Sequence, residues 1–282
     1  MPVRIEQIWR YPVKSMIGGL VTSADLHPLG IVGDRAWAVR DHVRGGIRGA
    51  KQLGGLMRLA ARYADGSDGP VVITLPDGAE VSTAEPDASE RVSAALDHPV
   101  TLEALRPPGD LDHYRRGRPD HDDIMDELRS VFGRTEDEPL PDFSVFPEAV
   151  FEYESPPGTY YDAFPLMLLT TSALRSLRDA LPGSRVDVRR FRPSIVVDTG
   201  GEPGHPEVGW MGRRLAIGDA EVEVTTGCPR CVMVTREIDG ETPQDRSILR
   251  HIVKDLGQNV GVYATVTIPG RIRTGDAVTL AA

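Results

Sequence analysis

The chain has few cysteines and no long apolar run. Its 282 residues include only two cysteines, too few for a disulfide framework, so the sequence predicts a protein of a reducing cytoplasm. No apolar stretch approaches the roughly 18 residues that a membrane span requires. Residues 1–6 lack the apolar core of an export signal and lead directly into strand-like sequence. We therefore expect a cytoplasmic protein with no membrane partner.

Basic residues are also in the minority. The 32 Lys and Arg residues stand against 42 Asp and Glu residues, for a formal net charge of -10. Such a surface repels phosphate backbones, which argues against general nucleic-acid binding but not against a local basic pocket. A glycine-rich nucleotide loop and a recognisable Ser-His-Asp signature are also missing from the sequence. The seven histidines are scattered, and we assign none of them a role.

Short strands separated by turns dominate the first hundred residues. Alternating apolar residues predict strands at 3–9, 21–26, 35–40 and 71–75, followed by a short helix at 87–96. The next segment, residues 106–158, is rich in proline and charge, with one helix predicted at 122–132. This change of texture indicates a boundary between two halves.

The second half mixes helices and strands. Helices are predicted after a cap at Thr171 or Ser172 and at 247–256, with strand-like runs at 195–197, 220–225, 232–235 and 260–268. We therefore predict an α+β, β-dominated fold. Its expected divisions are residues 1–105, a helical and loop connection at 106–150, and residues 151–282.

Both cysteines lie in one short motif, residues 227–231 (GCPRC). A structural zinc site would need four ligands, and no second Cys or His pair lies nearby. A thioredoxin-type pair usually begins a helix, whereas a strand is predicted here. Two alternatives remain open: a pair of buried thiols in a turn, or a thiolate ligand or nucleophile favoured by Arg230. The residue types do not tell which of Cys228 and Cys231 it would be.

Arginines cluster directly before a predicted buried strand. Residues 189–193 (RRFRP) precede the apolar run 195–197. For each arginine alone, a solvated face or a salt bridge to one of the many acids is the simplest explanation. Phe191 between the cations, with a strand behind it, indicates that at least one guanidinium points inward, where it needs an anion such as phosphate.

Two N-terminal turns offer further cations. Residues 11–15 (YPVKS) place Lys14 and Ser15 on the turn that leaves the first strand, and Gly18 and Gly19 allow close backbone approach. Residues 33–37 (GDRAW) place Arg35 at the start of a strand. Taken singly, each of these residues could be an ordinary surface residue. For Arg35, the simplest interpretation is an ion pair with Asp34 or another carboxylate.

In their order along the chain, these motifs resemble those of MOSC proteins with an N-terminal barrel domain. The resemblance rests on residues 11–15, 33–37, 190–197 and 227–231, and the closing residues 261–264 (GVYA) and 275–276 fit as well. It implies a MOSC β-barrel packed against an N-terminal β-barrel-like domain, with a molybdenum cofactor (molybdopterin) between them.

The resemblance also assigns roles. It implies that Cys231 is the thiolate ligand of the metal and the catalytic cysteine, and that Lys14, Ser15, Arg35 and Arg192 contact the cofactor. Ser194, Arg190 and Arg230 are further expected cofactor contacts, and Arg189 is a weaker candidate. The chain departs from the family at Met16, where many members have cysteine, and at Ser194, where asparagine is usual.

Members of this family include mitochondrial amidoxime-reducing components and bacterial reductases of N-hydroxylated compounds. The resemblance therefore implies a molybdenum-dependent oxidoreductase that reduces N-oxygenated small molecules. Because the chain has no further cysteines for an iron–sulfur domain, electrons are expected from a separate donor protein of the ferredoxin or flavin type. Two alternatives stay open: a non-catalytic carrier of the cofactor or of sulfur, and a pocket repurposed for another anion, for which Ser194 is the main support.

Overall fold

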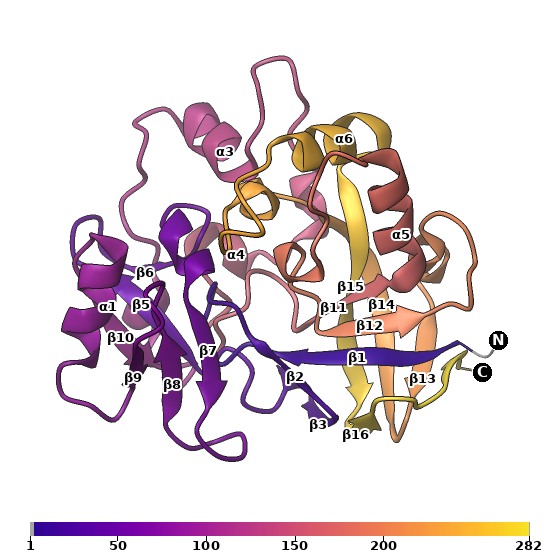
Figure 1. The fold of residues 1–282 in the computed structure, drawn as a ribbon, viewed down its shortest axis with the longest axis horizontal. Coiled ribbons are helices and arrows are strands. Elements are labelled where there is room, and N and C mark those ends of the chain that lie inside the picture. The colour runs from indigo at the N-terminus through magenta and orange to yellow at the C-terminus, as the bar shows by residue number, and fades with distance from the viewer. Residues whose placement is uncertain (1–2, 282) are drawn as a thin grey trace.

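The computed structural model describes residues 3–281, and its largest sheet is a mixed one that lies in the right-hand half of Figure 1. In sheet order, its strands are β17 (Val278–Leu280), β13 (Arg214–Ile217), β14 (Ala220–Pro229), β15 (Asn259–Ile268), β11 (Leu166–Thr170), β12 (Ile195–Asp198), β1 (Arg4–Arg10) and β2 (Gly19–Val21). Among the strands described in residues 3–281, only β11 and β12 pair in parallel. Parallel pairing requires a crossover, which begins with α5 (Thr171–Ala180).

Three small sheets complete the strands. They are β10 (Val100–Ala104), β5 (Trp37–Asp41) and β6 (Ile47–Arg48); β16 (Gly270–Arg273), β3 (Ser23–His27) and β4 (Gly30–Ile31); and β7 (Ala60–Tyr63), β8 (Val71–Thr74) and β9 (Glu80–Ser82). The other α-helices are α1 (Ala88–Leu96), α2 (Leu111–Tyr114), α3 (Ile124–Phe132), α4 (Ala149–Glu152) and α6 (Ser247–Asp255). The 3-10 helices are η1 (Gly54–Arg58), η2 (Phe143–Val145), η3 (Val188–Arg190), η4 (Pro206–Trp210) and η5 (Val232–Thr235).

Strand β1 links the two halves of the chain. It pairs antiparallel with β12, from Arg4 opposite Asp198 to Ile8 opposite Ile195, so the first strand belongs to the large sheet. The chain then passes into the half that holds β5 to β10 and α1, drawn in indigo and violet at the left of Figure 1. Strands β1 and β2 thus lie in the large sheet together with strands of the second half. The division of the chain at residues 105 and 150 stays a prediction.

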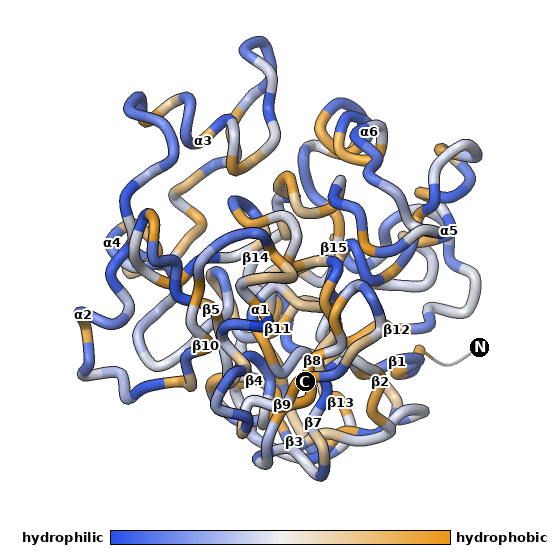
Figure 2. Tube along the Cα trace, turned by 60° about the vertical axis from the view of Figure 1, so that its left-hand side comes forward, coloured by the Kyte–Doolittle hydropathy of each residue, from blue (hydrophilic) through white to orange (hydrophobic). Residues whose placement is uncertain are grey.

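The centre of the large sheet is buried on both faces, because every residue of its central strand β11 is buried. In β11, Leu166 and Leu168 join a core cluster with strands β1, β12 and β14, while Met167 and Leu169 join a second cluster with α5 and α6. A third cluster fills the N-terminal half. Apolar segments run through the interior while hydrophilic loops form much of the periphery (Figure 2). Burial of these apolar side chains is the main stabilising contribution to both halves.

The predicted α+β, β-dominated class is confirmed, and most predicted elements form within a few residues of their expected bounds. Three local predictions are wrong. Residues 232–235 form the helical turn η5 and not a strand, the strand expected from Arg35 begins only at Trp37, and α5 is capped by Thr170, whose Oγ1 accepts from the Ala173 N–H at 3.0 Å. Because a helical turn follows Cys231, the expected strand gives no argument against a redox pair.

Candidate functional site

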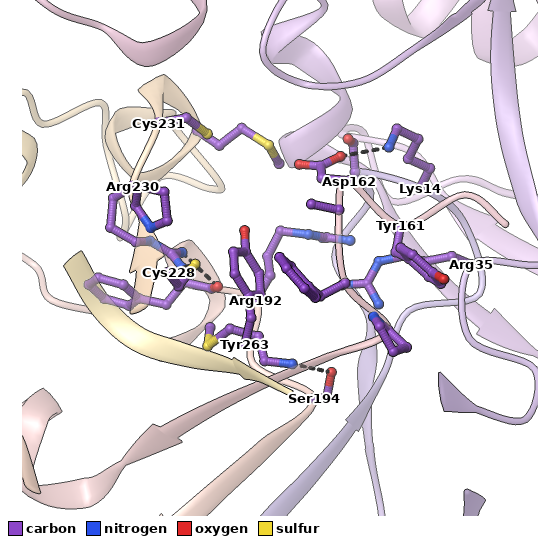
Figure 3. A pocket seen from close by; sticks show the side chains of 18 of the residues that line it. Lys14, Arg35, Tyr161, Asp162, Arg192, Ser194, Cys228, Arg230, Cys231 and Tyr263 are labelled. Atoms are coloured by element: carbon purple, nitrogen blue, oxygen red, sulfur yellow. Dashed lines mark hydrogen bonds and ion pairs between the residues drawn. The ribbon is translucent and has the colours of Figure 1, made fainter. Parts of the chain in front are cut away.

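A cavity of ≈ 80 Å³, here called the inner cavity, lies where the two halves of the chain meet. All eight residues predicted to form the site line it: Lys14, Ser15, Arg35, Arg190, Arg192, Ser194, Arg230 and Cys231. They come from four separate segments: the turn after β1, the turn before β5, the stretch from η3 to β12, and the junction of β14 with η5. In Figure 3, Cys228, Arg230 and Cys231 lie on one side, and Lys14, Arg35 and Tyr161 on the other.

Three of these residues have left-handed backbone conformations. Ser15, Arg35 and Arg192 have φ of 68°, 51° and 54°. Side chains other than glycine rarely adopt this region, at a cost of about 1–3 kcal/mol each, and such residues concentrate at functional sites. The conformations are held by hydrogen bonds: the Arg35 N–H donates to the Tyr11 carbonyl at 2.6 Å, and Ser15 Oγ accepts from the Ala50 N–H at 2.9 Å. The strained backbone positions therefore lie at the inner cavity, which all three residues line.

The ring of Tyr11 positions two arginines of the inner cavity, Arg35 and Arg192. Its buried ring lies 4.2 Å from the guanidinium carbon of Arg192 and 5.3 Å from that of Arg35. Its hydroxyl donates to the carbonyl of Pro193 at 3.0 Å, and burial raises the pKa of Tyr11, so the phenol stays neutral. Arg35 also pairs with Asp34, as its simplest interpretation predicted. The stacking of both guanidinium groups over the Tyr11 ring therefore fixes these arginines relative to the first strand.

Arg192 has an unpaired buried donor. The residue is 8% exposed, and its Nη1 donates to the Met16 carbonyl, but Nη2 has no acceptor among the described residues. Burial, reinforced by the nearby charge of Arg35, lowers the pKa of Arg192 to about 10, so the group remains charged at neutral pH. A buried cation with a free N–H is costly unless an anion meets it. This is the clearest sign that the inner cavity accommodates an anionic group.

The two cysteines occupy different environments. Cys228 is 3% exposed, and its Sγ accepts from Arg230 Nη1 at 2.9 Å. Arg230 also donates to the Phe191 carbonyl at 2.7 Å, while its Nε has no acceptor within residues 3–281. Cys231 is partly exposed, stands at the start of η5 and packs against the core of the N-terminal half. Of the two thiols, Cys231 is the more accessible to a ligand.

Asp162 is a site residue that the sequence reasoning missed. Its Oδ1 accepts from Lys14 Nζ at 2.6 Å, and its Oδ2 pairs with Lys51 Nζ at 3.0 Å. Lys14 also donates to Ser155 Oγ at 3.2 Å and to the Tyr160 carbonyl at 2.9 Å, so all three ammonium N–H groups have acceptors. Burial alone would raise the pKa of Asp162, but the two lysines outweigh it and hold the pKa well below the usual range. Lys14 therefore positions the segment that carries Asp162, and its predicted cofactor contact would require exchange of one of these partners.

The remaining predicted residues are tied to the scaffold. Arg190 is fully buried and donates to the carbonyls of four residues, Arg185, Val234, Arg236 and Pro243. Ser194 Oγ accepts from the Met167 N–H at 3.2 Å, which joins it to β11. Arg189 pairs with Asp187 and Asp239 and does not line the inner cavity. The geometry thus supports structural roles for Arg190 and Ser194, and their contacts with a cofactor remain predictions.

The donor set fits an anionic cofactor that brings its own metal. Arg192 and Arg230 offer unpaired buried N–H groups, and Cys231 offers one thiol, the type of ligand that soft metal centres prefer. Arg192, Arg230 and Arg35 would hold the anionic part, and Cys231 would hold the metal.

Replacement of Arg192 by methionine tests this fit. We expect the free energy of unfolding of cofactor-free protein to change by less than about 1 kcal/mol, or to rise, because the variant removes a buried cation without an anion. Cofactor retention should fall at least about tenfold, because a charge-assisted contact is lost. Urea unfolding and the pterin content of purified protein measure the two effects. A large loss of stability with unchanged pterin content would contradict the assignment.

The fold and this cavity define a protein of two β-rich halves, with a thiol on one side of a cationic cavity between them. The MOSC domain family matches residues 156–279, and the MOSC N-terminal beta barrel domain family matches residues 2–110. The chain therefore belongs to the MOSC proteins that carry both domains. Among residues 3–281, no helix has the length and apolar character needed to cross a membrane.

Amidoxime-reducing components are among its relatives. Mitochondrial amidoxime reducing component 2 of Rattus norvegicus is 33% identical over 131 residues, which are 42% of this chain and 37% of the rat protein's length. Mitochondrial amidoxime-reducing component 1 of Mus musculus is 25% identical over an alignment of 316 residues, which covers 98% of this chain and 82% of the mouse protein. The solved structure of the YUAD protein from Bacillus subtilis covers 99% of this chain and 94% of its own, with a TM-score of 0.45 and 12% identity, and supports no functional argument.

Proposed function

We propose that this chain is a molybdenum-cofactor-dependent reductase of N-hydroxylated compounds that takes electrons from a separate donor protein. The observation that carries the proposal is the inner cavity itself, which joins the accessible thiol of Cys231 to the unpaired guanidinium N–H of Arg192. A thiolate ligand and an anion-binding arginine are what a cofactor with a metal and a phosphate requires. The relatedness to amidoxime-reducing components supports the same reaction class.

The reaction has a simple balance. An amidoxime accepts two electrons and two protons, its N–O bond breaks, and an amidine and water are released. The cofactor, when bound, supplies a metal that exchanges the two electrons. The chain's own residues bind and orient: Cys231 would hold the metal, Arg192, Arg35 and Arg230 the anionic part, and Asp162 keeps Lys14 and Lys51 in place beside them. Because Asp162 outweighs burial and raises the pKa of Lys51, that lysine stays protonated at neutral pH.

Two alternatives share the same cavity. A carrier of the cofactor or of sulfur would use Cys231 without turnover, and a repurposed pocket would hold another anion without metal. The main support for repurposing was Ser194, but its hydroxyl is bonded to the backbone of β11. Because that hydrogen bond accounts for a serine at position 194 without a change of ligand, the reductase is the better supported function.

Metal content and turnover separate the three functions. Protein made in a host that synthesises the cofactor should contain molybdenum close to one atom per chain, measured by elemental mass spectrometry. With reduced viologen as an artificial donor, it should convert benzamidoxime to benzamidine, followed by liquid chromatography. Molybdenum without conversion would favour the carrier. Well-folded protein without molybdenum would favour the repurposed pocket and would overturn the proposal.

A further inference from the structure

A second cavity of ≈ 340 Å³, here called the outer cavity, adjoins the inner one. Cys231, Asp162 and Tyr263 line both cavities, so the outer cavity opens onto the thiol. The rest of its wall comes mainly from α3, η2 and α4 and is mostly apolar, with Lys51 and Arg116 as its further charged members. It includes Leu128, Val131, Phe132, Phe143, Phe146 and Val150.

The apolar side of α3 faces this space and not a core. The spacing of Ile124, Leu128, Val131 and Phe132 is that of a helix face that packs against protein, yet no residue of α3, η2 or α4 is buried. Phe143 packs against Phe132 with ring centroids 5.7 Å apart. Apolar side chains that line a concave space without filling it mark a binding site for an apolar ligand.

The two ends of the outer cavity differ in polarity. Asp162 and Lys51 lie at the end near Cys231. The remainder is lined mainly by apolar side chains of α3, η2 and α4, together with Arg116, whose guanidinium pairs with Glu154. A ligand with a small polar head and an apolar body would therefore place its head at the thiol. The volume is about twice the 150 Å³ or so that accommodates a benzene molecule in a protein interior, which leaves room for a ring and its substituent.

We infer that the outer cavity binds the apolar body of the substrate, so that the substrates are N-hydroxylated compounds with an aromatic or branched aliphatic body. The inference rests on the proposed function for the reacting group, but the apolar selectivity rests on α3, η2 and α4 alone. Compounds whose N-hydroxy group sits on a small or sugar-bearing body lack the surface that this wall would cover.

The test compares benzamidoxime with acetamidoxime, which shares the reacting group and lacks the ring. In wild-type protein, kcat/KM for benzamidoxime should exceed that for acetamidoxime at least about tenfold. Val150→Trp fills the outer cavity and should reduce this ratio about tenfold or more, mainly through KM for benzamidoxime. Val43→Trp is the matched control, because Val43 is 48% exposed and lines neither cavity, and it should leave the ratio unchanged.

Binding measured without turnover separates this inference from the proposed function. Calorimetry with benzamidine, the unreactive product, should show binding to wild-type protein that weakens about tenfold in Val150→Trp and in Phe146→Ala, the second variant that removes apolar surface without adding bulk. If benzamidine binds in this way but no amidoxime is reduced, the outer cavity stands and the reductase fails. If both amidoximes are reduced at equal kcat/KM in all variants, the reductase stands and the inference about the outer cavity is overturned.

Discussion

Replacing Cys231 by alanine is expected to remove molybdenum from the protein, whereas replacing Cys228 should leave most of it in place. Cys231 lines both cavities and is partly exposed, while the Cys228 thiol is buried and accepts from Arg230. Replacing a residue that only hydrogen-bonds to a metal ligand already lowers metal affinity about 10- to 100-fold. Loss of the ligand itself should therefore lower the molybdenum content at least about tenfold. Elemental mass spectrometry on protein from a cofactor-competent host gives the comparison.

Cys228→Ala serves as the control for this measurement. It deletes one buried sulfur atom, so we expect about 1 kcal/mol lower stability, with the molybdenum content above that of Cys231→Ala by several fold. Equal loss of metal in both variants would refute the assignment of Cys231. A persulfide on Cys231 of metal-free protein, seen by intact-mass spectrometry, would instead favour the sulfur carrier.

The residues predicted for the site line one cavity, and each belongs to a short motif at a strand end. Lys14 and Ser15, Arg35, Arg192 and Cys231 each sit on a turn next to a predicted strand, and turns at the same edge of packed sheets can meet. Such motifs can be recognised from residue type and spacing alone, without knowledge of the tertiary structure. They meet at one cavity because the fold brings their segments together, for example through the pairing of β1 with β12. The expectation that they would meet came from the family resemblance.

Pairings over long distances were not predictable in the same way. Asp162 lies 148 residues from Lys14, and many other acids in the chain could have been that partner. The run at residues 232–235 is apolar and short, so its period does not distinguish a strand from a helical turn. The face of α3 had the pattern of a core helix, and only the tertiary structure shows that a cavity, and not another element, lies against it.

Replacing Asp162 by asparagine is expected to lower the free energy of unfolding at pH 7 by about 2 kcal/mol. This loss of stability lies between the loss expected for an exposed ion pair and that expected for a fully buried one. The reason is that the Lys14 side chain is 3% exposed and the Asp162 side chain is 38% exposed. Lys14 and Lys51 outweigh burial and hold the pKa of Asp162 well below its usual range, so the folded state favours the carboxylate. This contribution is present above the pKa of the unfolded carboxyl, about 3.9, and is lost as pH falls through the folded value.

The stability difference between wild type and Asp162→Asn should therefore be constant from pH 7 to about pH 5 and should shrink below about pH 4. Urea unfolding across this range measures it. Asp25→Asn is the matched control, because Asp25 has a 59% exposed side chain whose nearest paired nitrogen, on Arg271, is 3.9 Å away, and that change should be within about 0.5 kcal/mol. A difference that grows as the pH falls would show that Asp162 does not act as the buried counter-ion of Lys14. In that case the ammonium of Lys14 would be free for an anion, and the cofactor contact predicted for it would become the better account of its burial.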